Sequence, residues 1–270
     1  MISGQGENNT KHIQKNELHI QHVCKTFETE NGVVQALENI NLDIGPGEFV
    51  SIVGASGCGK STLLKMMLGL ENPTEGQITI GSRTVTKPSV DVGMVFQEAR
   101  LYPWLNIEKN IEFGAPENMS KEEKRKKAKK YIDLVNLDGF EQAYPSQLSG
   151  GMQQRAGIAR ALIGNPEVLL LDEPFGALDA FTRITMQNEV LRVWEHEHKT
   201  MVLVTHDIDE AIFLSDRIVI LSDRPGSVKE IIPVNLSRPR DRSSNSFLEI
   251  RKKILMSFLG KTEVNVEYYI

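Results

Sequence analysis

Residues 54–62 read GASGCGKST, which places three glycines, one lysine and several hydroxyl side chains in nine positions. The stretch matches the Gly-x-x-x-x-Gly-Lys-Ser pattern of a phosphate-binding loop. Glycines let the backbone bend so that successive N–H groups point at phosphate oxygens, and a following helix adds its positive end. Lys60 would neutralise the β- and γ-phosphates, and the Ser61 hydroxyl oxygen would bind Mg²⁺. The predicted nucleotide-binding residues are Gly54, Ala55, Ser56, Gly57, Cys58, Gly59, Lys60, Ser61 and Thr62.

The segments around this loop predict an α/β fold. EFVSIVG (48–54) is an apolar strand that leads into the loop, and KSTLLKMMLGL (60–70) is typical of a helix. VLLLDEP (168–174) and TMVLVTHD (200–207) are apolar runs with polar carboxyl ends, and a helix is expected between them at about 180–197. Strands that alternate with helices indicate a mostly parallel sheet, whose ligands lie at the carboxyl ends of the strands.

Other segments predict the domain organisation. Residues 18–53 are expected to form short strands with turns at 31–32 and 45–47, and residues 76–85 a hairpin. Residues 98–165 are mostly helical in character, and Ser120 with Glu123 forms a capping box at the start of KEEKRKKAKKYIDLVNL. We expect a disordered polar tail over 1–16, one domain over 17–260 and a C-terminal tail over 261–270.

The composition narrows the possible classes of protein. The net charge is −5, which argues against a nucleic-acid partner because binding to a phosphate backbone needs a basic surface. No apolar run approaches the ~20 residues that span a bilayer, so a membrane role would require a separate membrane partner. The two cysteines, Cys24 and Cys58, form no CxxC motif and are typical of a reducing compartment.

Asp172 and Glu173 follow the strand at 168–172. A carboxylate at the end of a buried strand is costly unless it faces a cation or the water around one, so Asp172 is a candidate Mg²⁺ ligand. Glu173 is a candidate base for the water that attacks the γ-phosphate. Without the phosphate loop, a strand that ends in Asp-Glu-Pro would more often be a simple turn.

The stretch LSGGMQQR (148–155) predicts a second anion-binding helix start. Ser149 is a suitable N-cap, and Gly150 and Gly151 leave the backbone N–H groups of the first turn bare. A single nucleotide site does not need two such cradles, and an ordinary Ser-Gly helix start is the simpler interpretation of this stretch alone.

Six ordered motifs make the chain resemble the ATP-binding cassette ATPases over about residues 17–260. They are GASGCGKST, Gln97 in MVFQEARLYPW, LSGGMQQR, VLLLDEP, GALD (176–179) and His206. The resemblance implies a P-loop NTPase (RecA-like) core, an N-terminal antiparallel β subdomain and an inserted α-helical subdomain at about 98–165. In that family two cassettes pair head to tail, so the signature residues Ser149, Gly150, Gly151 and Gln153 are expected to bind the partner's ATP.

The resemblance also implies roles for single residues outside the phosphate loop. Gln97 matches the residue that reaches Mg²⁺ and links the core to the helical region, and His206 matches the switch histidine at the γ-phosphate. Asp179 lies in the loop that lines the dimer seam. Phe27 occupies the position of the aromatic residue that stacks on adenine, although a buried core phenylalanine is the alternative.

A lone cassette resembles the energy subunit of a bacterial importer at the cytoplasmic face of the membrane. Related translation factors carry two cassettes in one chain, and chromosome proteins insert a long coiled coil for which the sequence between Gly54 and Ser149 is too short. LYPWLNIEKNI and DRPGSVKEIIPVNLSRPR (223–240) resemble the nitrate, sulfonate and taurine group. The implied partners are a second copy, permease subunits and, indirectly, a solute-binding protein. The alternatives are an ATPase of a non-transport complex and a scaffold that binds ATP without turnover.

The segment EARLYPWLNI (98–107) is a candidate docking surface. Pro103 disfavours a continuous helix, so some of Leu101, Tyr102, Trp104 and Leu105 are expected on an exposed loop. Cassette importers dock a permease helix beside Gln97. The alternative is that all four side chains pack into the core of the helical region.

Overall fold

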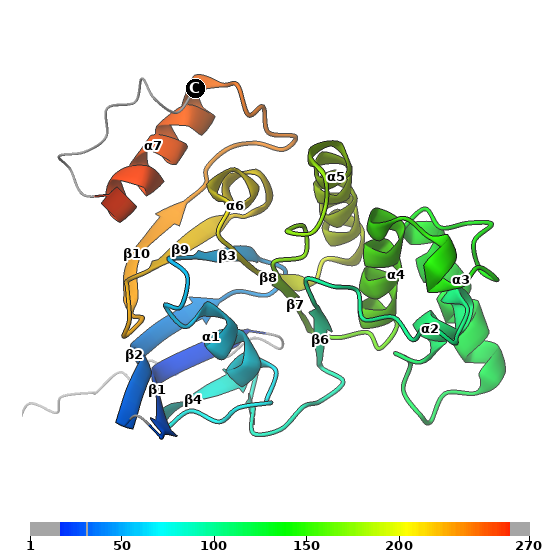
Figure 1. Ribbon diagram of the computed structural model, residues 1–270, viewed down its shortest axis with the longest axis horizontal. Coiled ribbons are helices and arrows are strands. Elements are labelled where there is room, and N and C mark those ends of the chain that lie inside the picture. The colour runs from blue at the N-terminus through cyan, green and yellow to red at the C-terminus, as the bar shows by residue number, and fades with distance from the viewer. Residues whose placement is uncertain (1–16, 31, 260–270) are drawn as a thin grey trace, which may run out of the picture.

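Two β-sheets and a group of helices form the chain in the computed structural model, which describes residues 17–30 and 32–259 (Figure 1). The first sheet is antiparallel, with the strand order β2-β1-β4-β5. Its strands are β1 (Leu18–Thr29), β2 (Gly32–Ile44), β4 (Glu75–Ile80) and β5 (Arg83–Thr84). The two predicted tails lie outside the described residues, so their proposed character remains a prediction.

The second sheet is the centre of the fold and has the strand order β10-β9-β3-β8-β7-β6. Five strands run parallel, and β10 pairs antiparallel with β9 at one edge. The strands are β3 (Phe49–Val53), β6 (Val92–Val95), β7 (Val168–Asp172), β8 (Thr200–Thr205), β9 (Arg217–Leu221) and β10 (Val228–Pro233). The predicted α/β class with a mostly parallel sheet and an antiparallel N-terminal sheet is confirmed.

The helices form two groups. Three lie together beyond β6 on one side of the molecule: α2 (Ile107–Glu112), α3 (Lys121–Leu134) and α4 (Gly150–Leu162). They fall inside the predicted helical region at 98–165. The others are α1 (Lys60–Met67), α5 (Ala180–Glu197), α6 (Ile208–Leu214) and α7 (Asn245–Leu259). None of the described helices is both long and apolar enough to cross a membrane.

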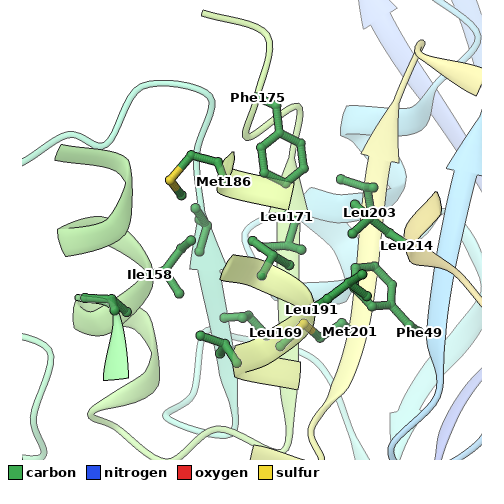
Figure 2. Close-up of a cluster of buried hydrophobic side chains, with 14 of the residues drawn as sticks. Phe49, Ile158, Leu169, Leu171, Phe175, Met186, Leu191, Met201, Leu203 and Leu214 are labelled. Carbon is green, nitrogen blue, oxygen red and sulfur yellow. The ribbon is translucent and has the colours of Figure 1, made fainter. Parts of the chain in front are cut away.

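Alternate side chains of the central sheet enter two separate cores. Val50, Ile52 and Leu170 pack with α1 and the antiparallel sheet in the first core. Phe49, Leu169 and Leu171 point the other way into the second core, where α4, α5 and α6 cover the sheet (Figure 2). Because both faces are buried, the strands read as continuous apolar runs rather than alternating ones.

The expectation of short strands at 18–53 is wrong, because β1 and β2 are long and pair from Leu18↔Ile44 to Thr29↔Gly32. Register shifts interrupt this pairing, and His22 and Asn39 have φ of 51° and 47°. Such bulges break the two-residue alternation that identifies a strand in sequence. The segments between the bulges therefore resemble separate short strands.

The predicted capping box of α3 is present. The Ser120 hydroxyl oxygen accepts from the Glu123 N–H at 3.3 Å, and the Glu123 carboxylate accepts from the Ser120 N–H at 2.9 Å. The helix ends at Leu134, before the end of the predicted stretch, because Asn136 adopts a left-handed φ of 53°.

Glu210 is a buried carboxyl on α6, 4% exposed, that accepts a 2.8 Å hydrogen bond from the Thr205 hydroxyl. Burial raises the pKa of Glu210 from 4.5 to about 7. At a pH between these two pKa values, Glu210 keeps its proton in the folded state but has lost it in the unfolded state. The free energy of unfolding therefore falls as the pH rises. Glu210→Gln should remove this fall and gain on the order of 2 kcal/mol over the wild type between pH 5 and pH 8.

Urea unfolding at the two pH values measures this difference. The exposed Glu249→Gln on α7 is the matched control and should show no pH-dependent gain. If Glu210→Gln differs from the wild type by the same amount at both pH values, Glu210 is already ionised in the folded protein.

Candidate functional site

The parallel strands bring the predicted site residues to one edge of the central sheet. The phosphate loop follows β3, Gln97 follows β6, Glu173 follows β7 and His206 follows β8. These strands are parallel, so their carboxyl ends lie at the same edge. A cavity of about 440 Å³ opens there. Its lining residues are Phe27, Val34, Ala36, Ser56, Gly57, Gly59, Lys60, Ser61, Thr62, Glu173, His206 and Arg224.

The phosphate loop has the backbone geometry that its glycines predict. Gly57 and Gly59 have φ of +78° and +103°, in the region that glycine tolerates best. A Cβ on Gly59 would lie 2.6 Å from Leu37 Cδ2, so the loop also packs closely on β2. Gly59 directly precedes α1, whose N-terminal turn is the predicted anion-binding end.

Lys60 lies at the floor of this loop and is 7% exposed. Its ammonium donates to the Gly54 carbonyl at 2.8 Å and to the Ala55 carbonyl at 2.9 Å. No ion pair to a carboxylate is recorded for Lys60 within residues 17–30 and 32–259. Carbonyl oxygens satisfy its hydrogen bonds without cancelling its charge, so that charge remains available to phosphate.

Asp172 and Ser61 lie together, as expected of a shared cation site. The Ser61 hydroxyl lies close enough to the Asp172 carboxyl to lower its pKa. Burial raises the pKa of Asp172, the charge on neighbouring Glu173 raises it further, and Lys65 and the Ser61 hydroxyl act in the opposite direction. A half-buried carboxyl beside a hydroxyl and a second carboxyl is a set of oxygen donors that suits a small divalent cation.

Glu173 and His206 are in contact. Glu173 Oε2 lies 3.1 Å from His206 Nδ1, and the side chain of His206 is well exposed to the cavity. The backbone of Glu173 has a left-handed φ of 45°, a conformation that costs energy in a residue other than glycine. The turn after β7 thus directs this carboxylate to the cavity rather than to the core.

Gln97 lies beside the same turn but does not line the cavity. A Cβ on Gly176 would lie 3.1 Å from Gln97 Nε2 and 3.5 Å from the Glu173 carbonyl oxygen. The Gln97 side chain therefore lies close to the turn that carries Glu173. Its roles at Mg²⁺ and in catalysis remain predictions.

Phe27 lines the cavity and is half-buried, unlike a core phenylalanine. It pairs across the first sheet with Val34, another lining residue. Its ring lines the cavity from the antiparallel sheet, with the Lys25 ammonium 4.8 Å from the ring centroid, and stacking of a base on it remains a prediction.

The signature residues lie apart from the cavity. Ser149 is the N-cap of α4, its hydroxyl accepts from the Met152 N–H at 3.4 Å, and the first turn of this helix is exposed at Ser149 and Gly150. Gly151 packs so closely on α5 that a Cβ would lie 2.6 Å from Thr182 Cγ2. None of the described lining residues comes from α4, and Gln153 donates to the carbonyls of Pro145 and Leu148. Within one chain, the phosphate loop and the start of α4, the two predicted anion-binding features, therefore lie apart.

Asp179 caps α5 and accepts from the N–H groups of Phe181 and Thr182, both at 3.1 Å. The Thr182 hydroxyl lowers the pKa of Asp179 most, and these backbone N–H groups lower it further. The carboxylate stays on the surface, close in sequence to exposed Phe181.

Sequence reasoning missed Val34, Ala36 and Arg224 as lining residues. Val34 and Ala36 are on β2 and carry no motif, so only the packing of the two sheets brings them to the cavity. Arg224 lies in the loop after β9. Its position just beyond the carboxyl end of a parallel strand was the sequence signal that could have identified it.

Comparison with known proteins agrees with this geometry. Residues 37–176 match the model of the ABC transporter family. The aliphatic sulfonates import ATP-binding protein SsuB of Bacillus thuringiensis subsp. konkukian is 52% identical over 88% of this chain and 94% of its own length. SsuB of Bacillus subtilis (strain 168) is 48% identical over 90% of this chain and 94% of its own length.

Solved structures show the same fold. The ATP-binding cassette MJ0796, described as a dimer in a post-hydrolysis state with ADP and Pi, has a TM-score of 0.70 and 38% identity. The match covers 82% of this chain and 100% of that one. The phosphate loop, the Asp172–Glu173 pair, the facing His206 and these similarities together show that the chain is an ATPase that belongs to the ABC transporter family.

Proposed function

We propose that the chain is the energy-coupling subunit of an importer for a small sulfonate, nitrate, taurine or a related solute. The observation that carries this proposal is the similarity, over most of both chains, to relatives named as aliphatic sulfonates import proteins. The subunit would bind a permease at the cytoplasmic face of the membrane, and hydrolysis would drive solute movement. An ATPase of a non-transport complex remains the second candidate.

Deletion of the gene in its source organism tests this function. Uptake of labelled ethanesulfonate, taurine and nitrate is measured in the deletion strain, with the wild-type gene or Lys60→Ala returned on a plasmid. We expect one of these uptakes to be lost and to be restored only by the wild-type gene. Undiminished uptake of all three would favour the non-transport alternative or another solute.

The chemistry of hydrolysis follows from the contacts at the cavity. Lys60 would hold the β- and γ-phosphates, and Asp172 with Ser61 would hold Mg²⁺, which neutralises phosphate charge when bound. Glu173 lies in hydrogen-bonding distance of His206, so the two side chains can share the region around the attacking water. Glu173 would accept the proton of that water, and His206 would hold the γ-phosphate.

Glu173→Gln should keep ATP binding and lose most hydrolysis. The amide has nearly the same shape but cannot accept the proton, so kcat should fall by roughly 10²–10⁴. Phosphate release and nucleotide affinity are measured on the same preparation. A variant that hydrolyses ATP near the wild-type rate would exclude Glu173 as the base.

The separation of Ser149 from the cavity supports a head-to-tail pair of chains. The exposed start of α4 would reach a bound nucleotide where a second copy presents its own cavity to it. Each composite site would then contain Lys60 of one protomer and Ser149 of its partner, and MJ0796 has been solved as a dimer.

Ser149→Arg should leave the ATP affinity of the monomer within about twofold but block dimerisation and turnover, because a bulky cation would fill the seam. ATP-dependent dimerisation is measured by size exclusion in the Glu173→Gln background. Ser120→Arg, at the N-cap of α3, is the matched control because it also removes a cap but should dimerise normally. Equal loss of ATP affinity in the isolated Ser149 variant would contradict a role across the interface.

An aromatic cluster near Gln97 is the proposed permease-docking surface. Trp104 and Phe113 are 69% and 62% exposed, and the Tyr102 ring lies 5.4 Å and 4.6 Å from theirs. A groove of about 430 Å³, lined in part by Tyr102 and Phe113, adjoins it. Leu101 packs against the core instead, so the predicted cluster is divided between surface and interior.

Trp104→Ala should spare the basal ATPase of the isolated subunit and weaken binding to the permease by roughly tenfold or more, as for a central aromatic contact. Assembly with the permease and stimulation by loaded solute-binding protein are the measurements. Phe140→Ala removes another exposed aromatic and serves as the control. Early melting of the Trp104 variant with normal assembly would show that Trp104 supports the fold instead.

A further inference from the structure

The loop between β9 and β10 brings a cation to the nucleotide cavity. β9 is the neighbour of β3 on the side away from β8, and its carboxyl end lies at the same edge of the sheet. The carboxyl ends of the other parallel strands carry the phosphate loop, Gln97, Glu173 and His206. Arg224 lies in the loop between β9 and β10 and lines the same cavity.

The loop is fixed to two other parts of the site. The Gly226 N–H donates to the Ala36 carbonyl at 3.0 Å, and its carbonyl accepts from the Glu38 N–H at 2.9 Å. A Cβ on Gly226 would lie 2.0 Å from the Cys58 carbonyl oxygen, so the loop touches the backbone of the phosphate loop. The Ser222 hydroxyl donates within the loop and accepts from the Ser227 N–H at 2.9 Å. These contacts hold Arg224 beside the cavity.

The guanidinium is held by a neutral oxygen. Its Nε and Nη2 donate to the Gly57 carbonyl oxygen at 3.2 Å and 3.1 Å. No carboxylate within ion-pair distance is recorded for Arg224 among the residues that the structure describes. Two other arginines form ion pairs with carboxylates, Arg217 of β9 with Glu48 and Arg238, beyond β10, with Asp216. The Arg224 charge is thus oriented but uncompensated, which suits an anionic ligand.

The strand order decides which part of the nucleotide Arg224 faces. Glu173 and His206 follow β7 and β8 on one side of the phosphate loop, where the γ-phosphate is hydrolysed. Arg224 follows β9 on the other side, and its loop is bonded to β2, which carries the lining residues Val34 and Ala36. Phe27 lies on the paired strand. A nucleotide with its base at Phe27 and its γ-phosphate at Glu173 would place its α-phosphate between them, on the side of Arg224.

We propose that Arg224 is a nucleotide-binding residue that donates hydrogen bonds to the α-phosphate from the β9–β10 loop. The inference rests on ATP binding in this cavity. Its second contact, to Gly57, would couple the nucleotide to the tip of the phosphate loop. Because ATP, ADP and AMP all carry an α-phosphate, Arg224 should act on each of them alike.

Affinities of ATP, ADP, AMP and adenosine for the full chain test the proposal. Arg224→Gln should weaken the three phosphorylated ligands by a similar factor, roughly threefold to tenfold for one partly exposed charged hydrogen bond, and spare adenosine. Arg224→Lys should keep most of the affinity because it keeps the charge. The loss should shrink at high salt. Lys229→Gln removes a cation of β10 that donates to the Ser257 carbonyl outside the cavity, and it is the control.

Four results would overturn the proposal. They are unchanged affinities in Arg224→Gln, a loss confined to ATP, an equal loss for adenosine, and a Lys variant as weak as the Gln variant. A Lys variant as weak as the Gln variant, together with a lowered melting temperature, would show that Arg224 only holds the Gly57 backbone in place. Failure of the wild-type chain and of Lys229→Gln to bind ATP would instead contradict nucleotide binding itself.

Discussion

Five parallel strands end at one edge of the central sheet, and the chemistry of the protein depends on that alignment. Side chains of these strands enter the two cores on opposite faces of the sheet, and this burial fixes the register. The loops that follow the strands need no long side chains to meet at one cavity. The phosphate loop, Glu173 and His206 come from distant parts of the sequence and are brought together by strand order alone.

The same alignment leaves the predicted signature residues at the start of α4 outside the cavity of their own chain. The helical subdomain packs against β6 and places the exposed N-terminal turn of α4 away from the cavity. In its own chain this turn faces solvent and does not line the nucleotide cavity. A second copy would supply both a ligand for this turn and a cover for the cavity, so the geometry supports the proposed pairing of chains.

Short motifs in the sequence predicted much of the cavity and one helix start. Lys60, Asp172 and Glu173 occur in short motifs whose chemistry depends on neighbours in the sequence, and the capping box at Ser120 is equally local. The long strands β1 and β2 were not predicted because bulges at His22 and Asn39 interrupt their alternation.

Arg224 could not be predicted from a motif, because its position depends on β9 lying beside β3 and on the pairing of Gly226 with β2. Pro103 predicted that some of the four side chains around it would be exposed, but only the packed structure shows that Trp104 is exposed and that Leu101 packs against the core.

We expect ATP to be hydrolysed only where two chains meet. Specific ATPase activity measured over a wide range of protein concentrations, alongside sedimentation in the presence of ATP, tests it most directly. The rate per chain should fall towards zero on dilution, in parallel with the dissociation of the dimer. A rate per chain that stays constant while the protein sediments as a monomer would contradict the account.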